Sequence, residues 1–207
     1  MNPWLVLSVE KHMKIKYIYK KEMDNLIQKS ISDSIWEKAS LRLKEIMEQY
    51  KDIPDGEHLH ADNYIFPAAA VYLTLKEEID ERTAYDVVEK ACMKKSLIVN
   101  KILSNLLKIP GMNSLFINLL DPLSRRMFGS KCGFENVFYP KKKGEFRMDI
   151  TSCPYVRYFT ALSCPELTKI FCANDERCYG KLEGIEFIRS GSLGNGDELC
   201  DFYMKKK

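Results

Sequence analysis

The sequence predicts an α+β protein, in which an N-terminal helical layer packs on a small C-terminal antiparallel sheet with two further helices. Two observations support this prediction. Apolar residues recur at intervals of three and four through the first 128 residues. From Gly129 onward glycines become frequent, and pairs of short segments alternate between apolar and polar residues. We therefore expect a single domain over residues 1–207, with a helical part at 1–128 and an α+β part at 129–207.

The N-terminal part is expected to form four helices. Apolar residues keep a helical period in each segment, and proline or glycine follows most of them. Asp62 is a candidate N-cap for the second helix, and Pro67 suits only its first turn. The predicted helices cover residues 20–49, 62 or 67 to 78, 80 or 83 to about 108, and 113–128.

The C-terminal part is expected to form two hairpins and two helices. Pro140, three lysines and Gly144 separate the strands of the first hairpin, and a glycine-rich turn separates those of the second. Pro154 fits the first turn of the helix after the first hairpin. The predicted elements are strands 135–139 and 145–151, helices 154–162 and 165–182, and strands 185–189 and 199–204.

Charge and hydropathy exclude several classes of partner. The net charge is +3, from 32 basic and 29 acidic residues, and no aromatic residues interleave with the lysine runs to stack on bases. No apolar run reaches the ~20 residues that span a bilayer. We therefore expect no nucleic-acid partner and no membrane span, while a homo-oligomer stays open.

The seven cysteines indicate a reducing compartment. Their number is odd and no secretory signal precedes them, which favours reduced thiols in the cytoplasm. Cys153, Cys172, Cys178 and Cys200 are separated by 19, 6 and 22 residues, whereas structural zinc sites use close pairs. The His-x-His of residues 58–60 is similar to that of metal-dependent amidohydrolases, but those need a barrel of roughly 250 residues. No metal or other cofactor is expected.

Two residues of the C-terminal part are candidates for chemistry. Cys153 lies where a predicted strand meets a predicted helix, so the helix-start N–H groups could favour its thiolate. A buried structural cysteine is the alternative. Asp175 falls on the apolar face of the predicted helix 165–182, where a carboxylate is costly unless paired. It is either an acid/base or cation-binding group, or a buried aspartate that caps a loop or pairs with an arginine.

Three segments of the C-terminal part resemble the L-2-amino-thiazoline-4-carboxylic acid hydrolase family. They are Phe146 to Tyr155 (FRMDITSCPY), Phe171 to Asp175 (FCAND) and Arg189 to Phe202 (RSGSLGNGDELCDF). The resemblance implies a small-molecule substrate and a hydrolase that acts on the C–N/C–S bonds of a cyclic amidine, opening a cyclic isothiourea that bears a carboxylate to N-carbamoyl-cysteine. The Gly196 to Phe202 ending is also similar to vinyl-reductase-type domains, which implies the alternative of a non-enzymatic small-molecule-binding module.

The chemistry implied by the resemblance requires a nucleophile or activated water, a carboxylate for the amidinium and a cation for the substrate carboxylate. Our hypothesis makes Cys153 the nucleophile and Asp175 the amidinium partner or acid/base. The candidates for substrate binding are Arg189 or Arg157 as carboxylate anchor, Cys172 and Cys200 as pocket lining, and His60 and Asn63 reaching the pocket from the helical layer.

Overall fold

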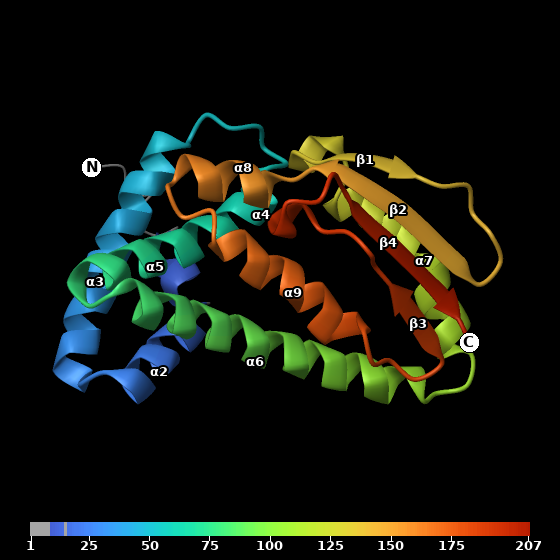
Figure 1. Ribbon diagram of the computed structural model, residues 1–207, viewed down its shortest axis with the longest axis horizontal. Helices are drawn as coiled ribbons and strands as arrows, with labels where there is room; N and C mark the ends of the chain where they lie inside the picture. Colours follow the sequence, from blue (N-terminus) through green and yellow to red (C-terminus); the bar gives the residue numbers. More distant parts are fainter. Residues whose placement is uncertain (1–8, 15) are drawn as a thin grey trace.

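Helices form the chain up to residue 127, and a four-stranded antiparallel sheet with two more helices follows (Figure 1). The structure is a computed structural model that describes residues 9–14 and 16–207. The predicted α+β class is therefore confirmed. The N-terminal elements are α2 (Tyr17–Leu26), α3 (Lys29–Gln49), α4 (His58–His60), the π-helical turn η1 (Ala61–Ile65), α5 (Phe66–Glu78), α6 (Glu81–Leu107) and α7 (Met112–Met127).

The C-terminal elements follow the predicted order. The short 3-10 turn η2 (Ser130–Cys132) leads into the sheet. The remaining elements are β1 (Glu135–Phe138), β2 (Glu145–Ser152), α8 (Pro154–Ala161), α9 (Leu167–Tyr179), β3 (Ile185–Ile188), the 3-10 turn η3 (Leu193–Asn195) and β4 (Cys200–Lys206). Both predicted hairpins are present, but α9 ends three residues earlier than expected.

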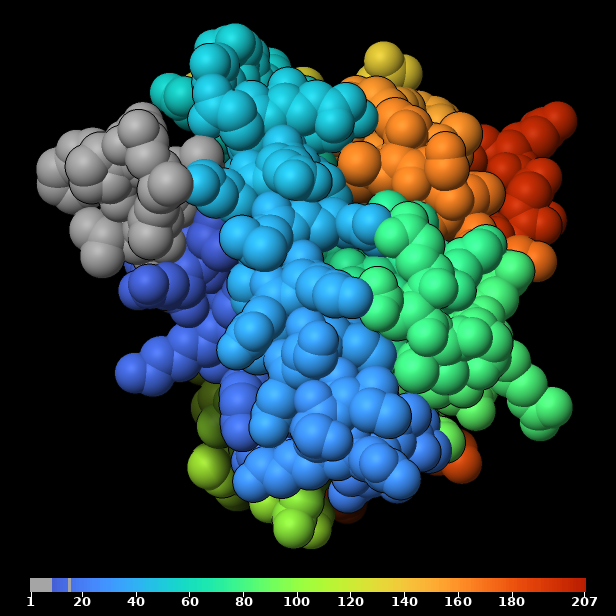
Figure 2. Space-filling view, turned by 90° about the vertical axis from the view of Figure 1, so that its left-hand side faces the viewer, coloured from blue at the N-terminus to red at the C-terminus, as the bar shows by residue number. Residues whose placement is uncertain are grey.

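The predicted single helix over residues 20–49 is wrong, because the chain turns at Ile27 and Gln28. Ile27 adopts an extended conformation (φ −133°, ψ 161°), and the Ser32 hydroxyl donates a 2.7 Å hydrogen bond to Asp24 across the break. The break lets α2 pack on α6 while α3 packs on α5. Apolar periodicity alone does not reveal it, since both helices bury a face of the same core. In Figure 2, α3 runs down one face of the molecule beside the connection between α5 and α6.

The helix around residue 62 also begins earlier than predicted. Asp62 lies inside the π-helical turn that joins α4 to α5, so it is not an N-cap. Pro67 does lie in the first turn of α5, and Asp80 caps α6 by accepting a 2.8 Å hydrogen bond from the Thr83 N–H. A π-helical turn inserts an extra residue into the helix and is often found at functional sites.

The sheet has the strand order β1-β2-β4-β3 and places the C-terminal strand in its centre. Cys200, Phe202 and Met204 alternate with more exposed residues along β4, so Cys200 and Phe202 face inward. Helix α7 packs on β2 and β4, while α9 contacts α6 and β3 (Figure 1). Helix α9 is therefore placed between the helical part and the sheet.

Within the described residues, no helix combines the length and the hydropathy needed to cross a membrane.

Candidate active site

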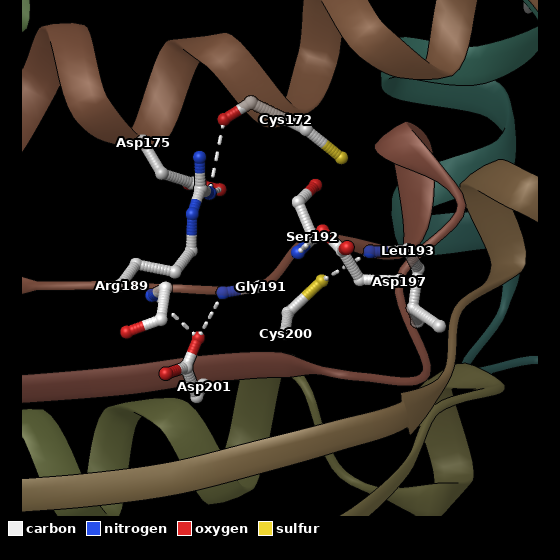
Figure 3. Close-up of polar contacts among 10 residues, drawn as sticks. Cys172, Asp175, Arg189, Gly191, Ser192, Leu193, Asp197, Cys200 and Asp201 are labelled. Carbon is white, nitrogen blue, oxygen red and sulfur yellow. Dashed lines mark hydrogen bonds and ion pairs between the residues drawn. The ribbon is translucent and has the colours of Figure 1, made fainter.

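Helix α9 carries a thiol and a carboxyl group one turn apart, at Cys172 and Asp175 (Figure 3). The helix buries Leu167, Thr168 and Ile170 completely or nearly so. Cys172 and Asp175 are only partly buried and lie toward the loop between β3 and β4. The helix therefore holds both groups on a rigid element while part of each side chain stays accessible.

The loop from β3 to β4 is fastened by two aspartates. Asp201 Oδ1 accepts the backbone N–H of Ser190 at 2.8 Å and that of Gly191 at 2.6 Å. Asp197 accepts the Ser192 N–H at 2.7 Å. These bonds satisfy the backbone donors of the loop, and they hold it in place next to α9 (Figure 3).

Gly194 brings this loop against the Cys172 sulfur. A Cβ atom built on Gly194 would lie only 2.7 Å from Cys172 Sγ, which no side chain could occupy without a shift. The missing side chain lets the Gly194 N–H reach the sulfur, where it lowers the pKa of the Cys172 thiol. The Ser192 hydroxyl, at 2% residue exposure and with no other partner in the described chain, points toward the same sulfur in Figure 3.

Cys172 is the thiol of the site that ionises most readily. A hydrogen bond from the Cys200 thiol is the largest cause, and it lowers the pKa of Cys172 to about 6 against the opposing effect of burial. The Ser192 hydroxyl, the Gly194 N–H and the charge of Arg189 lower this pKa further. Cys200 keeps its proton as the donor, so its own pKa is raised. Cys200 Sγ also accepts the Leu193 N–H at 3.3 Å.

Asp175 is held by Arg189 and titrates near neutrality. Arg189 Nη1 donates to Asp175 Oδ2 at 2.9 Å and to the Cys172 carbonyl at 3.0 Å. Burial raises the pKa of Asp175 to about 7, outweighing the opposing effect of Arg189, and the nearby Cys172 adds to the rise. The Asp175 side chain is still 33% exposed, so one side of it faces open space. A carboxyl group with this pKa can both donate and accept a proton at neutral pH.

Cys153 lies at the N-cap of α8, as the sequence predicted, but the expected thiolate is not found there. Burial raises the pKa of Cys153 to about 12, and the N–H groups of Tyr155 and Val156 compensate only in part. Cys172 and Asp175 raise it further, which places Cys153 beside the same cluster. Cys153 is therefore a neutral thiol, because the cost of burying a charge exceeds what a short helix can return.

His60 reaches the site through Tyr155. His60 is 2% exposed, and its Nε2–H donates to the Met127 carbonyl at 2.7 Å, so Nδ1 accepts from the Tyr155 hydroxyl at 3.1 Å. Burial lowers the pKa of His60, which keeps the ring neutral. Asn63, on the π-helical turn, donates to the Leu59 carbonyl at 3.0 Å.

Arg157 is not part of the cluster. It forms an ion pair with Glu57 and stacks on Tyr158, and its side chain is 49% exposed. Of the two arginines predicted as a carboxylate anchor, only Arg189 lies with Cys172 and Asp175. In the sequence, aromatic residues lie close to both arginines, so the local pattern does not show which of them joins Cys172 and Asp175.

A groove of about 650 Å³ lies on the η3 side of the cluster, and Cys172, Asp175 and Arg189 do not line it. It runs between α8, the start of α9 and the η3 loop, and it includes Gly194, which touches the Cys172 sulfur. Within the described part of the chain, no three histidine, cysteine or acidic side chains are grouped to hold a metal ion. The residues that line the groove are Tyr85, Val156, Thr160, Pro165, Glu166, Thr168, Lys169, Leu193, Gly194, Asn195 and Gly196.

The sequence prediction assigned no chemical role to Ser192 or Gly194. Both belong to the Ser-Gly-Ser-Leu-Gly-Asn-Gly-Asp segment, which the sequence predicts as the glycine-rich turn of the second hairpin and which is part of the family resemblance. The density of glycine in this loop was the available signal, because glycine permits close approach of a backbone to another group.

The fold and the site define an α+β protein with an activated thiol and a carboxyl group of shifted pKa on one helix. The sequence model of the L-2-amino-thiazoline-4-carboxylic acid hydrolase family matches residues 58–204. The chain therefore belongs to this family. The match begins at α4 and ends in β4, so it includes every residue of the cluster. No curated protein and no solved structure matches the chain significantly.

Proposed function

We propose that this protein hydrolyses a small cyclic amidine or isothiourea that carries a carboxylate, as the name of its family suggests. The observation that carries the proposal is the Cys172–Asp175–Arg189 cluster. It combines a thiol of pKa about 6 with a carboxyl group of pKa about 7 on neighbouring turns of one helix. Nucleophilic catalysis requires such an activated nucleophile together with an acid/base group.

In the first half of the proposed reaction, the Cys172 thiolate attacks the amidine carbon between the ring nitrogen and the ring sulfur. The ring C–S bond then breaks, and the protonated Asp175 carboxyl donates its proton to the leaving sulfur. The substrate carbon is now bound to Cys172 as an isothiourea, and the substrate has a free thiol. For such a substrate, the step that opens the ring breaks its C–S bond.

In the second half, water attacks the same carbon while the Asp175 carboxylate takes a proton from it. The Cys172 thiolate leaves, and a carbamoyl group remains on the substrate nitrogen. One water molecule is consumed, and both Cys172 and Asp175 return to their starting protonation states. Arg189 positions Asp175 through the 2.9 Å hydrogen bond, which the carboxyl oxygen accepts in either protonation state, and favours the thiolate by its charge.

Release of a free thiol from 2-amino-thiazoline-4-carboxylate tests the proposal. Purified protein should produce one thiol per carbamoyl product, measured with a chromogenic disulfide reagent and by mass. Cys172→Ser should lose most of the activity, whereas Cys178→Ser, on the same helix, should keep it. Lack of thiol release from this acid and from related cyclic amidines would contradict the proposed hydrolase activity. Tight binding of the acid without turnover would instead favour the small-molecule-binding module.

The mechanism also distinguishes Cys172 from Cys153. A Cys153→Ser variant should keep substantial activity, because burial leaves the Cys153 thiol neutral at working pH. If Cys153→Ser is inactive while Cys172→Ser is active, the nucleophile is Cys153 and the assignment above is wrong.

The chain is further proposed to act as one domain in the cytoplasm. Contacts of α9 with α6, and of α8 with the π-helical turn, join the two parts of the chain and support a single unit. All seven cysteines are free, which fits a reducing compartment and a mechanism that depends on thiols.

A further inference from the structure

Lys16 is a buried cation with no acidic partner. The residue is 4% exposed, and it forms no ion pair with any carboxylate of the described residues. The residues outside the described ranges contain no aspartate or glutamate. An unpaired buried charge is costly, so either the charge is lost or an anion from outside the chain supplies the pairing.

A second lysine lies close to the first. Lys16 Nζ is 4.3 Å from the centre of the Tyr64 ring, and Lys95 Nζ is 5.1 Å from the same centre. Burial first, and then the neighbouring Lys95, lowers the pKa of Lys16 to about 7. Two ammonium groups that converge on one ring repel each other, although the ring face attracts each of them. Their convergence forms a positive site open to solvent on the side of Lys95, which is exposed.

The other groups around this site do not supply the missing negative charge. Asp62 acts on the nearby His12, but its hydrogen-bond partner is His58 Nδ1 at 3.0 Å, and among the described side chains it forms no ion pair with Lys16 or Lys95. Burial raises the pKa of Cys92, and it raises the pKa of Tyr19 well above its ordinary value, so both stay neutral. The Asn174 Oδ1 atom is buried and has no hydrogen-bond partner in the described chain. His12 is 8% exposed and its Nδ1 atom is likewise without a partner there. Several polar groups at this place therefore have unmet hydrogen-bonding capacity.

Tyr155 connects the lysine pair to the cysteine–carboxyl cluster. The Tyr155 hydroxyl donates to His60 at 3.1 Å, and the His60 ring lies 6.1 Å from the Tyr64 ring on which the lysines converge. Burial raises the pKa of Tyr155, and Cys153, Tyr64 and Asp175 raise it further, so all three act electrostatically on its hydroxyl. Asn174 precedes Asp175 on α9 and interacts with Cys92 beside the lysines. The lysine pair and the Cys172–Asp175 cluster are thus two ends of one region. The lysine pair favours an anion, and the carboxyl group of the cluster favours a cation or a hydrogen-bond donor.

We propose that Lys16 and Lys95, converging on Tyr64, form an anion subsite that binds the carboxylate of the substrate, while Asp175 binds or protonates its amidine end. This deepens the proposed function and rests on it for the identity of the substrate. A substrate with a carboxylate at one end and an amidine at the other would place its anion at the unpaired lysines and its amidine nitrogens at the partly buried Asp175 carboxyl group. An ion pair at the lysines and a hydrogen bond at Asp175 would fix the orientation of the ring at Cys172.

Calorimetric binding of 2-amino-thiazoline-4-carboxylate and of its uncharged carboxamide tests the subsite. The full chain carrying Cys172→Ala is used, so that turnover does not interfere. Lys16→Met and Lys95→Met should each weaken binding of the acid about tenfold or more, as expected for loss of a charge-assisted contact. Lys94→Met is the matched control, because Lys94 neighbours Lys95 but pairs with Glu22 at 2.6 Å, and it should leave the affinity unchanged.

The carboxamide should bind weakly and should not respond to any of the three substitutions. Equal affinity for acid and carboxamide, no binding of the acid, or acid binding that ignores both lysines would overturn the subsite. Ligand-free Lys16→Met should melt at or above the temperature of the parent, since it removes an unpaired buried charge. A lower melting temperature would make Lys16 structural and contradict the proposal.

Thiol release by the chain with Cys172 intact, measured beside this calorimetry, separates the two proposals. If the parent chain releases no thiol but binds the acid through the lysines, the hydrolase proposal fails and the subsite stands. If it releases thiol with an unchanged KM in Lys16→Met and Lys95→Met, the hydrolase stands and the subsite fails.

Discussion

Replacing Cys200 by alanine removes the largest cause of the low pKa of Cys172. A hydrogen bond to a charged group is worth about 1.5–3 kcal/mol, and one pKa unit corresponds to about 1.4 kcal/mol. The pKa of Cys172 should therefore rise from about 6 to about 7–8 in the Cys200→Ala variant. The Ser192 hydroxyl and the Gly194 N–H remain, so the thiol should still ionise below its ordinary value.

Alkylation by iodoacetamide, followed by mass spectrometry of the peptide containing α9, measures this change. At pH 6 the thiolate fraction of Cys172 falls from about one half to between about a tenth and a hundredth. A thiolate of higher pKa is intrinsically about threefold to eightfold more nucleophilic, which offsets part of the loss. The variant should thus react about twofold to sixfold more slowly at pH 6 and about threefold to eightfold faster at pH 9.

The crossing of the two pH profiles is the signature, because a general change in accessibility would move both limbs in one direction. Cys178→Ala is the control, since Cys178 lies on the same helix and its thiol contacts the Ser96 carbonyl at 3.7 Å. A midpoint that stays near 6 in Cys200→Ala would refute the reasoning, as would an equal shift in Cys178→Ala.

Three further predictions follow from the site. Gly194→Ala should slow both alkylation of Cys172 and thiol release about tenfold or more, because the new Cβ would meet the sulfur at 2.7 Å; unchanged rates of both would contradict this close approach. The kcat/KM of the wild-type protein should rise with pH as Cys172 ionises near 6 and fall as Asp175 ionises near 7. Asp175→Asn should lower kcat by about 10²–10⁴ and abolish the fall at higher pH; a fall that persists belongs to another group. His60→Phe should lower the free energy of unfolding by about 1–3 kcal/mol, since it removes the two hydrogen bonds of a buried imidazole. Asn63→Ala should change it by less than about 0.5 kcal/mol; equal melting temperatures for these two variants would argue against a stabilising role of the His60 hydrogen bonds.

Much of the secondary structure was predictable because local signals agree with the tertiary context. The Asp80 cap, the Pro110–Gly111 stop and the turn around Pro140 each mark an element boundary through backbone chemistry alone. The break at Ile27 was not predictable in this way. Apolar residues continue through it at a helical period, and the turn depends on packing against two different helices.

The candidate site was predictable in its residue types and only partly in its roles. The position of Asp175 on a buried face and its pairing with an arginine were both among the expected alternatives, and the structure identifies Arg189 as the partner. The thiol with the lowest pKa could not be identified from the sequence. Helix-start geometry favours Cys153, but burial decides otherwise.

The sequence by itself determined the α+β class, the two hairpins, the family and the segments that carry the cysteines and aspartates. These follow from local periodicity, turn residues and short motifs. The tertiary structure decided which groups act on one another. The Cys172 pKa depends on Cys200, Ser192 and Gly194, which lie 20 to 28 residues away in the chain. The unpaired state of Lys16 likewise depends on which acids do not reach it. Such quantities depend on distance and burial in space, and sequence patterns do not record either.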